Sequence, residues 1–288
     1  MVKFRNATEH DKAAVADIWH KCFEDDFFVI DKFLHNGFEC YVAENDSGVP
    51  IAMLHFIRCK ISLENDIADA VYLYAAATLP DYRKQGIMSA LINYANNAAA
   101  ERGIKFCILM PATEKLFDYY GKIGYYKFFK TKFVTVSAEE LKAFSDFKVN
   151  SEKYLFDNIT NLRFNIYKHD YGNVLWDKKV IKYAADMYEY YKGGIVTDGM
   201  GCMLCSKPSE NVTEVLETVC TEKNFQALIN KLCDTFKTEY YRFRLPVNSS
   251  LVKGSCETKY IGMIKCLGEI TLDAAKPNGG FYLGLTLD

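Results

Sequence analysis

The chain has 288 residues, of which 50% are hydrophobic and 25% are charged, and its formal net charge is −2 with a pI near 6.2. This composition is typical of a soluble globular protein, and it excludes the strong overall basicity that favours nucleic acid or an anionic membrane surface. The length suits two domains of ordinary size.

Location and metal content follow from other features of the sequence. No apolar run approaches the length of a membrane span, and the first residues, Met-Val-Lys-Phe-Arg-Asn, lack the apolar core of a signal peptide. We therefore expect a cytoplasmic protein with reduced cysteines and no membrane or nucleic-acid partner. No metal is expected, because Cys202 and Cys205 fall in a strand pattern that turns them to opposite faces. The sequence leaves open whether the protein is a homo-oligomer.

The N-terminal elements are a short strand, a helix and a strand pair. The strand is expected at residues 2–5, and Thr8 is a plausible N-cap for a helix, with Asp11 three residues further on. Strands at 38–43 and 50–57 are separated by a turn rich in Asn, Asp, Ser and Gly.

The most informative segment runs from residue 69 to residue 91. An apolar strand over 69–78 is followed by a turn through Pro80 and Asp81 and then by a helix from about residue 87. A glycine-containing turn at a helix start exposes amide groups without intrahelical partners, and the helix dipole adds positive potential. The pattern thus predicts a phosphate site, and its candidate contacts are Arg83, Lys84, Gln85, Gly86, Ile87, Met88 and Ser89.

Two familiar phosphate loops are excluded by spacing. A Walker loop needs an earlier glycine and a Gly-Lys pair followed by Ser or Thr, and a dinucleotide fingerprint needs three glycines. Gly86 is the only glycine of this turn. The anion site therefore belongs to another class of phosphate-binding protein.

The elements after the turn continue a regular order. An apolar helical stripe ends at Gly103, a strand follows at 105–110, and a helix is expected at 113–122. This helix ends in Tyr120-Gly-Lys-Ile-Gly124-Tyr125, and a strand rich in aromatic and β-branched residues runs on to residue 136. The order predicts an α/β fold with a mixed sheet.

Two signatures in this region resemble those of the GNAT superfamily of N-acetyltransferases. The spacing Arg83-x-x-Gly86-x-Met88 is similar to the acyl-CoA loop of that family, although Met88 stands where the family has Gly or Ala. The tail Tyr120-x-x-x-Gly124-aromatic is similar to the second signature. The resemblance implies a GNAT fold and a catalytic domain at residues 1–148.

The resemblance also implies roles for individual residues. Acetyl-CoA would be the co-substrate, with its pyrophosphate on the 83–89 turn and its pantetheine arm beside the backbone of Ala76, Ala77 and Thr78. Tyr120 would be the general acid, the alternative being a packing role alone. Its neighbour Tyr119 is expected in the core.

The second half repeats the element order without the loop. A polar helix at 138–147 and a linker at 148–152 precede helices at 177–191 and 222–236. The expected strands are at 194–197, 201–206, 211–219, 240–245, 260–265 and 281–287. Because no Arg-x-x-Gly turn precedes the second helix, residues 149–288 are interpreted as a smaller, degenerate GNAT-like accessory domain. Tandem proteins of this kind include the enhanced-intracellular-survival family.

That distant resemblance suggests a role for the C-terminus. In the enhanced-intracellular-survival family the terminal carboxylate enters the active site, which makes Asp288 a second candidate catalytic residue. The alternative is a plain edge strand that ends in solvent. The general base is left open among Asp66, Asp69, the carboxylates of residues 24–26 and the C-terminus.

The sequence thus predicts an acetyl-CoA-dependent N-acetyltransferase that acts on a small-molecule amine by direct attack on the thioester. A non-catalytic acyl-CoA-binding or regulatory protein is the alternative. Aminoacyl transfer from tRNA would need a basic groove, and the weak net charge argues against it.

Overall fold

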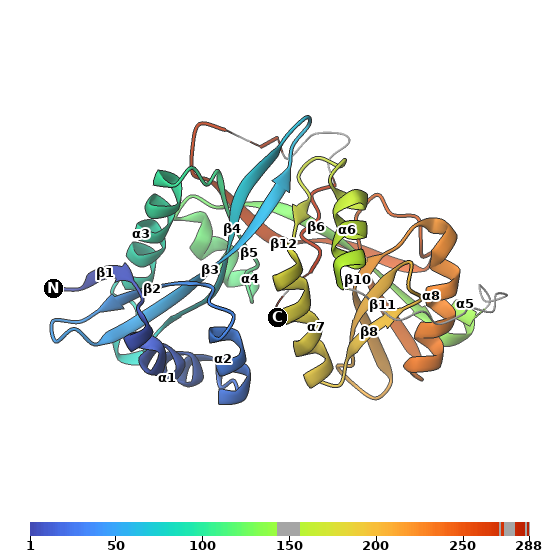
Figure 1. Ribbon diagram of the computed structural model, residues 1–288, viewed down its shortest axis with the longest axis horizontal. Helices are drawn as coiled ribbons and strands as arrows, with labels where there is room; N and C mark the ends of the chain where they lie inside the picture. The colour runs from blue at the N-terminus through green and yellow to red at the C-terminus, as the bar shows by residue number, and fades with distance from the viewer. Residues whose placement is uncertain (143–155, 271, 274–279, 286, 288) are drawn as a thin grey trace. The chain divides into compact units, whose positions relative to one another are not determined.

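A computed structural model describes residues 1–142, 156–270, 272–273, 280–285 and 287 (Figure 1). Internal contacts divide the chain into two units. Unit 1 comprises Met1–Cys59, Ala68–Tyr126 and Met263–Leu272, and unit 2 comprises Lys60–Ile67, Lys127–Gly262 and Asp273–Asp288. The domain boundary expected between residues 148 and 149 lies outside the described residues and stays a prediction.

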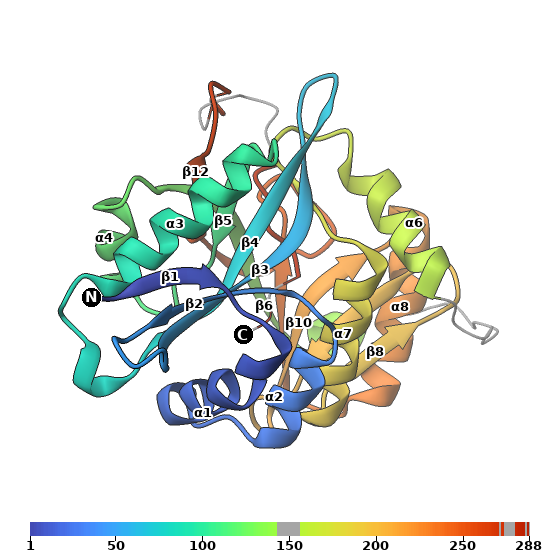
Figure 2. The same ribbon diagram turned by 60° about the vertical axis from the view of Figure 1, so that its left-hand side comes forward.

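Unit 1 contains a sheet with two helices on each face (Figure 2). Its strands are β1 (Lys3–Asn6), β2 (Glu39–Glu44), β3 (Pro50–Ser62), β4 (Ile67–Thr78), β5 (Phe106–Leu109) and the last part of β12 (Ser255–Cys266). Its helices are α1 (Lys12–Phe23), α2 (Phe27–Leu34), α3 (Ile87–Glu101) and α4 (Glu114–Gly121), with short 3-10 turns at Glu9–Asp11 and Pro80–Tyr82.

The sheet of unit 1 is mixed. Strands β1, β2 and β3 pair antiparallel, whereas β4 and β5 pair parallel, with Ala70 opposite Phe106. The end of β12 then pairs antiparallel with β5, so that Met263 lies opposite Leu109. A parallel pair needs a crossover, and α3 supplies it between β4 and β5.

The two faces of this sheet are covered by different helix pairs. Helices α3 and α4 bury Leu91, Ala95 and Phe117 against strand residues such as Leu54 and Leu73. On the other face, α1 and α2 bring Trp19 and Phe33 against β3 and β4. Asp26 accepts a hydrogen bond from the Phe28 amide, 3.0 Å away, and so caps the start of α2.

Unit 2 contains five neighbouring strands of a mixed sheet. In order across it lie β6 (Tyr126–Ser137), β11 (Tyr240–Leu245), β10 (Val212–Val219), β9 (Cys202–Ser206) and β8 (Gly194–Thr197). Strands β10 and β11 are parallel and α8 (Glu222–Thr235) connects them; the other three pairs are antiparallel. The short strand β7 (Val174–Leu175) pairs with the end of β3. The remaining helices are α5 (Ala138–Lys142), α6 (Phe156–Tyr167) and α7 (Lys178–Tyr190).

The core of unit 2 holds a buried ion pair and the last described segment of the chain. Arg163 of α6 donates to the Glu217 carboxylate of β10 at 2.8 Å, and both side chains are about 1% exposed. Residues 280–285 run past this pair, and the indole of Trp176 donates to the Leu283 carbonyl oxygen at 2.9 Å. Backbone hydrogen bonds also hold this segment, since the amides of Lys130 and Val174 donate to the carbonyl oxygens of Phe281 and Tyr282.

The α/β class and the mixed sheet predicted from the sequence are confirmed. Two local predictions differ from the structure. Helix α6 was not expected, and residues 281–285, expected in a strand, have no strand structure. In the described part of the chain, no helix is long and apolar enough to cross a membrane.

Candidate active site

The residues predicted to bind phosphate lie around the start of α3. Strand β4 ends at Thr78, a 3-10 turn follows over Pro80–Tyr82, and α3 begins at Ile87. The Ala90 amide donates to the Gly86 carbonyl oxygen at 3.0 Å, which is the first turn of the helical hydrogen-bond pattern. The amides of Ile87, Met88 and Ser89 precede it, and so they can donate to a ligand.

The backbone of this turn needs two left-handed residues. Gly86 has a φ of 76° and Lys84 a φ of 63°. Only glycine adopts this conformation without strain, which explains Gly86 and makes Lys84 a strained position. A Cβ added to Gly86 would meet no atom within 4 Å, and so the space over the helix start is open.

Two side chains of the turn bond back to its own backbone. The Arg83 guanidinium donates from Nε to the Thr78 carbonyl oxygen at 2.9 Å, and its Nη2 lies 3.5 Å from Cys22 Sγ of α1. Gln85 donates to the Asp81 carbonyl oxygen at 3.2 Å. Arg83 and Lys84 are both exposed and add positive charge at the helix start.

Met88, the departure from the family pattern, is turned toward the protein interior. Its side chain packs against the core cluster of unit 1, and Ile87 is buried in that cluster. The long side chain therefore contributes to the core, and its amide remains at the first turn of α3. The sequence had left this substitution without an explanation.

The end of β4 carries two unusual features. Ala75 has a φ of 49°, a left-handed conformation inside a strand, and no turn residue in the sequence signals it. Ala77 is buried, while the buried hydroxyl of Thr78 has no hydrogen-bond partner among the described residues. An unpartnered buried hydroxyl next to the phosphate turn fits a site that takes its partner from a ligand.

Of the two adjacent tyrosines of α4, Tyr120 is the more buried, although Tyr119 was expected in the core. Tyr120 is 9% exposed and lies in the core cluster, with its ring 5.8 Å from that of Tyr125, whereas Tyr119 is half-buried. The Tyr119 hydroxyl lies 2.9 Å from the Ser89 hydroxyl of α3. Burial raises the pKa of the Tyr120 hydroxyl, so this group remains protonated at neutral pH.

The candidate bases have different surroundings. Asp69 is exposed at the start of β4, nine residues before Thr78, or about 30 Å at a rise of ~3.3 Å per residue. Asp66 accepts from the Ile67 amide at 2.7 Å in the preceding turn. Asp25 accepts from the Trp19 indole at 2.7 Å. Asp288 lies outside the described residues.

A buried histidine lies beneath α1 and α2. His55 of β3 is 1% exposed, and neither ring nitrogen has a hydrogen-bond partner among the described residues. Its ring centroid lies 5.4 Å from that of Trp19 and 4.9 Å from that of Phe33. Desolvation lowers the pKa of His55 to about 3, so the imidazole is neutral.

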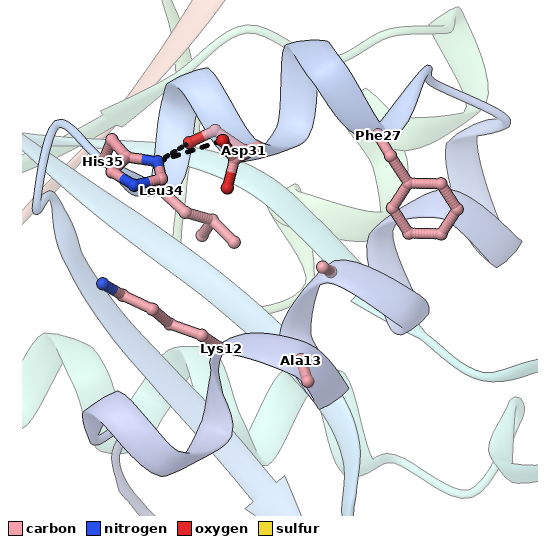
Figure 3. A pocket seen from close by; sticks show the side chains of 7 residues that line it. Lys12, Ala13, Phe27, Asp31, Leu34 and His35 are labelled. Carbon is pink, nitrogen blue, oxygen red and sulfur yellow. Dashed lines mark hydrogen bonds and ion pairs between the residues drawn. The ribbon is translucent and has the colours of Figure 1, made fainter.

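A small pocket lies between α1 and α2 (Figure 3). Its volume is about 370 Å³. Ala13, Ala16 and Leu34 form its apolar part, while an Asp31 carboxylate oxygen lies 3.2 Å from His35 Nδ1 at one side. The pocket opens beside Phe27, the first residue of α2, whose ring stacks on His20 at 4.4 Å.

Comparison with known proteins agrees with this geometry. The family model of the acetyltransferase (GNAT) domain matches residues 3–128. A search of curated protein sequences finds no match.

Several solved structures share the fold at low sequence identity. A GCN5-related N-acetyltransferase from Anabaena variabilis has a TM-score of 0.75 and 14% identity, over 93% of this chain and 73% of that one. A probable N-acyltransferase from Enterococcus faecalis has a TM-score of 0.74 and 12% identity, with coverage of 93% and 73%. Eis1 from Mycobacterium abscessus has a TM-score of 0.66 and 12% identity, with coverage of 93% and 74%. The likeness extends over both halves of the chain.

Proposed function

We propose that this chain, whose residues 3–128 match the family model of the acetyltransferase (GNAT) domain, transfers an acetyl group from acetyl-CoA to the amine of a small molecule. The observation that carries the proposal is the first turn of α3. There, three amides without intrahelical partners, two cationic side chains and open space over Gly86 occur together at the end of β4.

The described residues fit acetyl-CoA. This co-substrate supplies the thioester and, in its pyrophosphate, the negative charge that a helix start favours. The amides of Ile87, Met88 and Ser89 would hold the pyrophosphate, with Arg83 and Lys84 as cationic partners. The end of β4, with the unpartnered hydroxyl of Thr78, would line the pantetheine arm.

Direct attack by the amine requires two proton transfers. The departing thiolate must gain a proton, and we assign its donor as Tyr120, whose phenol is kept protonated by burial. The acceptor ammonium must lose a proton before attack. Asp26 caps α2 and Asp25 binds Trp19, so Glu24 is the carboxylate of this turn that we keep as a candidate base, together with the terminal carboxylate of Asp288.

The turn between α1 and α2 supports an acceptor that is cationic and partly apolar. Phe23, Phe27 and Phe28 are exposed there, and Glu24, Asp25 and Asp26 lie between them in the sequence. The same segment lies near the end of β4, because the Cys22 thiol donates to the Thr78 carbonyl oxygen at 3.4 Å. An ammonium on an apolar group complements both features.

The test is thiol release from acetyl-CoA across a library of primary amines, with the acetylated product identified by mass spectrometry. We expect CoA release that depends on both the amine and the enzyme. Binding of acetyl-CoA without release for any amine would instead support the alternative, a non-catalytic acyl-CoA-binding or regulatory protein. Absence of acetyl-CoA binding would refute both.

A further inference from the structure

The hydrogen bond between Tyr119 and Ser89 joins α4 to the first turn of α3. The two hydroxyl oxygens are 2.9 Å apart, and the residues are 30 positions apart in the sequence. Ser89 is the third residue of α3, and its own amide is one of the three that precede the first helical hydrogen bond. The bond therefore lies at the edge of the anion site.

The chemistry of the two hydroxyls indicates which one donates. A phenol is a stronger acid than an aliphatic alcohol, so the Tyr119 hydroxyl is the better donor and Ser89 Oγ the better acceptor. A serine hydroxyl has one hydrogen and two lone pairs. When Ser89 Oγ accepts from Tyr119, its own hydrogen stays available for another acceptor.

The helix itself competes weakly for that hydrogen. A serine within a helix often donates to the carbonyl oxygen four residues earlier. For Ser89 that residue is Gln85, which lies before α3 begins, and the Gly86 carbonyl oxygen already accepts from the Ala90 amide. A negatively charged oxygen at the start of α3 is a stronger acceptor than either.

We propose that Tyr119 is a positioning residue for the acyl donor: its hydroxyl donates to Ser89 Oγ and so directs the Ser89 hydroxyl hydrogen toward the pyrophosphate of CoA. This inference rests on the proposed function, since it takes acyl-CoA as the ligand. It gives Tyr119 a role distinct from that of Tyr120. Tyr119 acts on binding of the phosphates, and Tyr120 acts on the thiolate.

The experiment is a double-mutant cycle on the full chain with Tyr119→Phe, Ser89→Ala and the double variant. Kd for CoA is measured by calorimetry, and Kd for pantetheine, which has no phosphate, by NMR titration. Tyr94→Phe is the matched control, because it also removes a half-exposed tyrosine hydroxyl, from the outer part of α3. Thermal unfolding checks that every variant is folded.

We expect Ser89→Ala to raise Kd for CoA about 10-fold, as for the loss of a hydrogen bond to a charged group. Tyr119→Phe should raise it about 3- to 10-fold, and the double variant no further than Ser89→Ala alone. Pantetheine affinity should not change in any variant. Equal losses for CoA and pantetheine, additive losses, or an unchanged Kd for CoA in Tyr119→Phe would each overturn the inference.

The outcome separates this inference from the proposed function. Wild-type protein that binds CoA, with variants that bind it equally well, overturns the role of Tyr119 alone. Wild-type protein that does not bind CoA overturns both. If the variants lose CoA affinity but the wild-type protein acetylates no amine, the positioning role of Tyr119 is supported and the proposed transferase activity is refuted.

Discussion

The buried, unpartnered imidazole of His55 predicts a loss of stability in mild acid. Its pKa is about 3 in the folded protein, because desolvation disfavours the charged form, whereas a histidine in an unfolded chain titrates near 6.5. Protonation therefore favours the unfolded state. The stability that the neutral ring contributes is complete above about pH 6.5, and it is lost progressively as the pH falls toward 3.

The size of the effect follows from these two values. At pH 5 the unfolded-state pKa of about 6.5 lies about 1.5 units above the pH, so the unfolded histidine is stabilised by protonation, whereas the folded histidine, with a pKa of about 3, stays neutral. At 1.36 kcal/mol per unit, the free energy of unfolding should fall by about 2 kcal/mol. With a urea m-value of about 1.5 kcal/mol/M, the midpoint of unit 1 should move by more than 1 M.

Urea unfolding followed by tryptophan fluorescence measures this shift. Trp19 contacts His55 and reports on unit 1, so the second tryptophan, Trp176 of unit 2, is replaced by Phe in all samples. In His55→Phe the midpoint shift between pH 8 and pH 5 should largely disappear, since the other rings around this site do not titrate. An equal shift with and without His55 would refute the reasoning.

Three further predictions concern the site and unit 2. Tyr120→Phe should lower kcat at least 100-fold, measured by steady-state kinetics, and leave Kd for acetyl-CoA within 3-fold, measured by calorimetry. An unchanged kcat would show that Tyr120 has no role in catalysis. Gly86→Val should weaken CoA binding more than 10-fold, because the position has a φ of 76° and the new side chain occupies the space over the helix start; wild-type affinity by calorimetry would contradict this. Gly284→Ala places a Cβ 2.4 Å from both Arg163 Nη2 and Glu217 Oε1, so it should destabilise unit 2 by about 3 kcal/mol or more. Urea unfolding measures this loss, and an unchanged midpoint would contradict the packing around the ion pair.

The sequence predicted the features that depend on local chemistry. Gly86 stands out because the turn before α3 needs a left-handed residue, and the spacing from Arg83 to Gly86 distinguishes this turn from other phosphate loops. The end of the apolar helical stripe was also readable, since Gly103 follows α3 with a φ of 82°. Such signals lie within a few residues of the feature they specify.

Features that depend on distant contacts were not predictable. Ala75 and Lys84 have left-handed backbones, although neither residue type signals this conformation. Tyr119 was expected in the core, whereas its hydroxyl contacts Ser89 of α3, a partner 30 positions away that no local pattern signals.

The pairing of β12 with β5 has a consequence for how the chain folds. Residues 263–266 supply the strand next to Phe106–Leu109, so the sheet of unit 1 includes a strand synthesised more than 150 residues later. During translation this edge of β5 stays unpaired until residues 263–266 have left the ribosome, and such long-range pairing slows folding. A fragment that stops before β12 should therefore expose this edge and aggregate, even though it retains both acetyltransferase signatures.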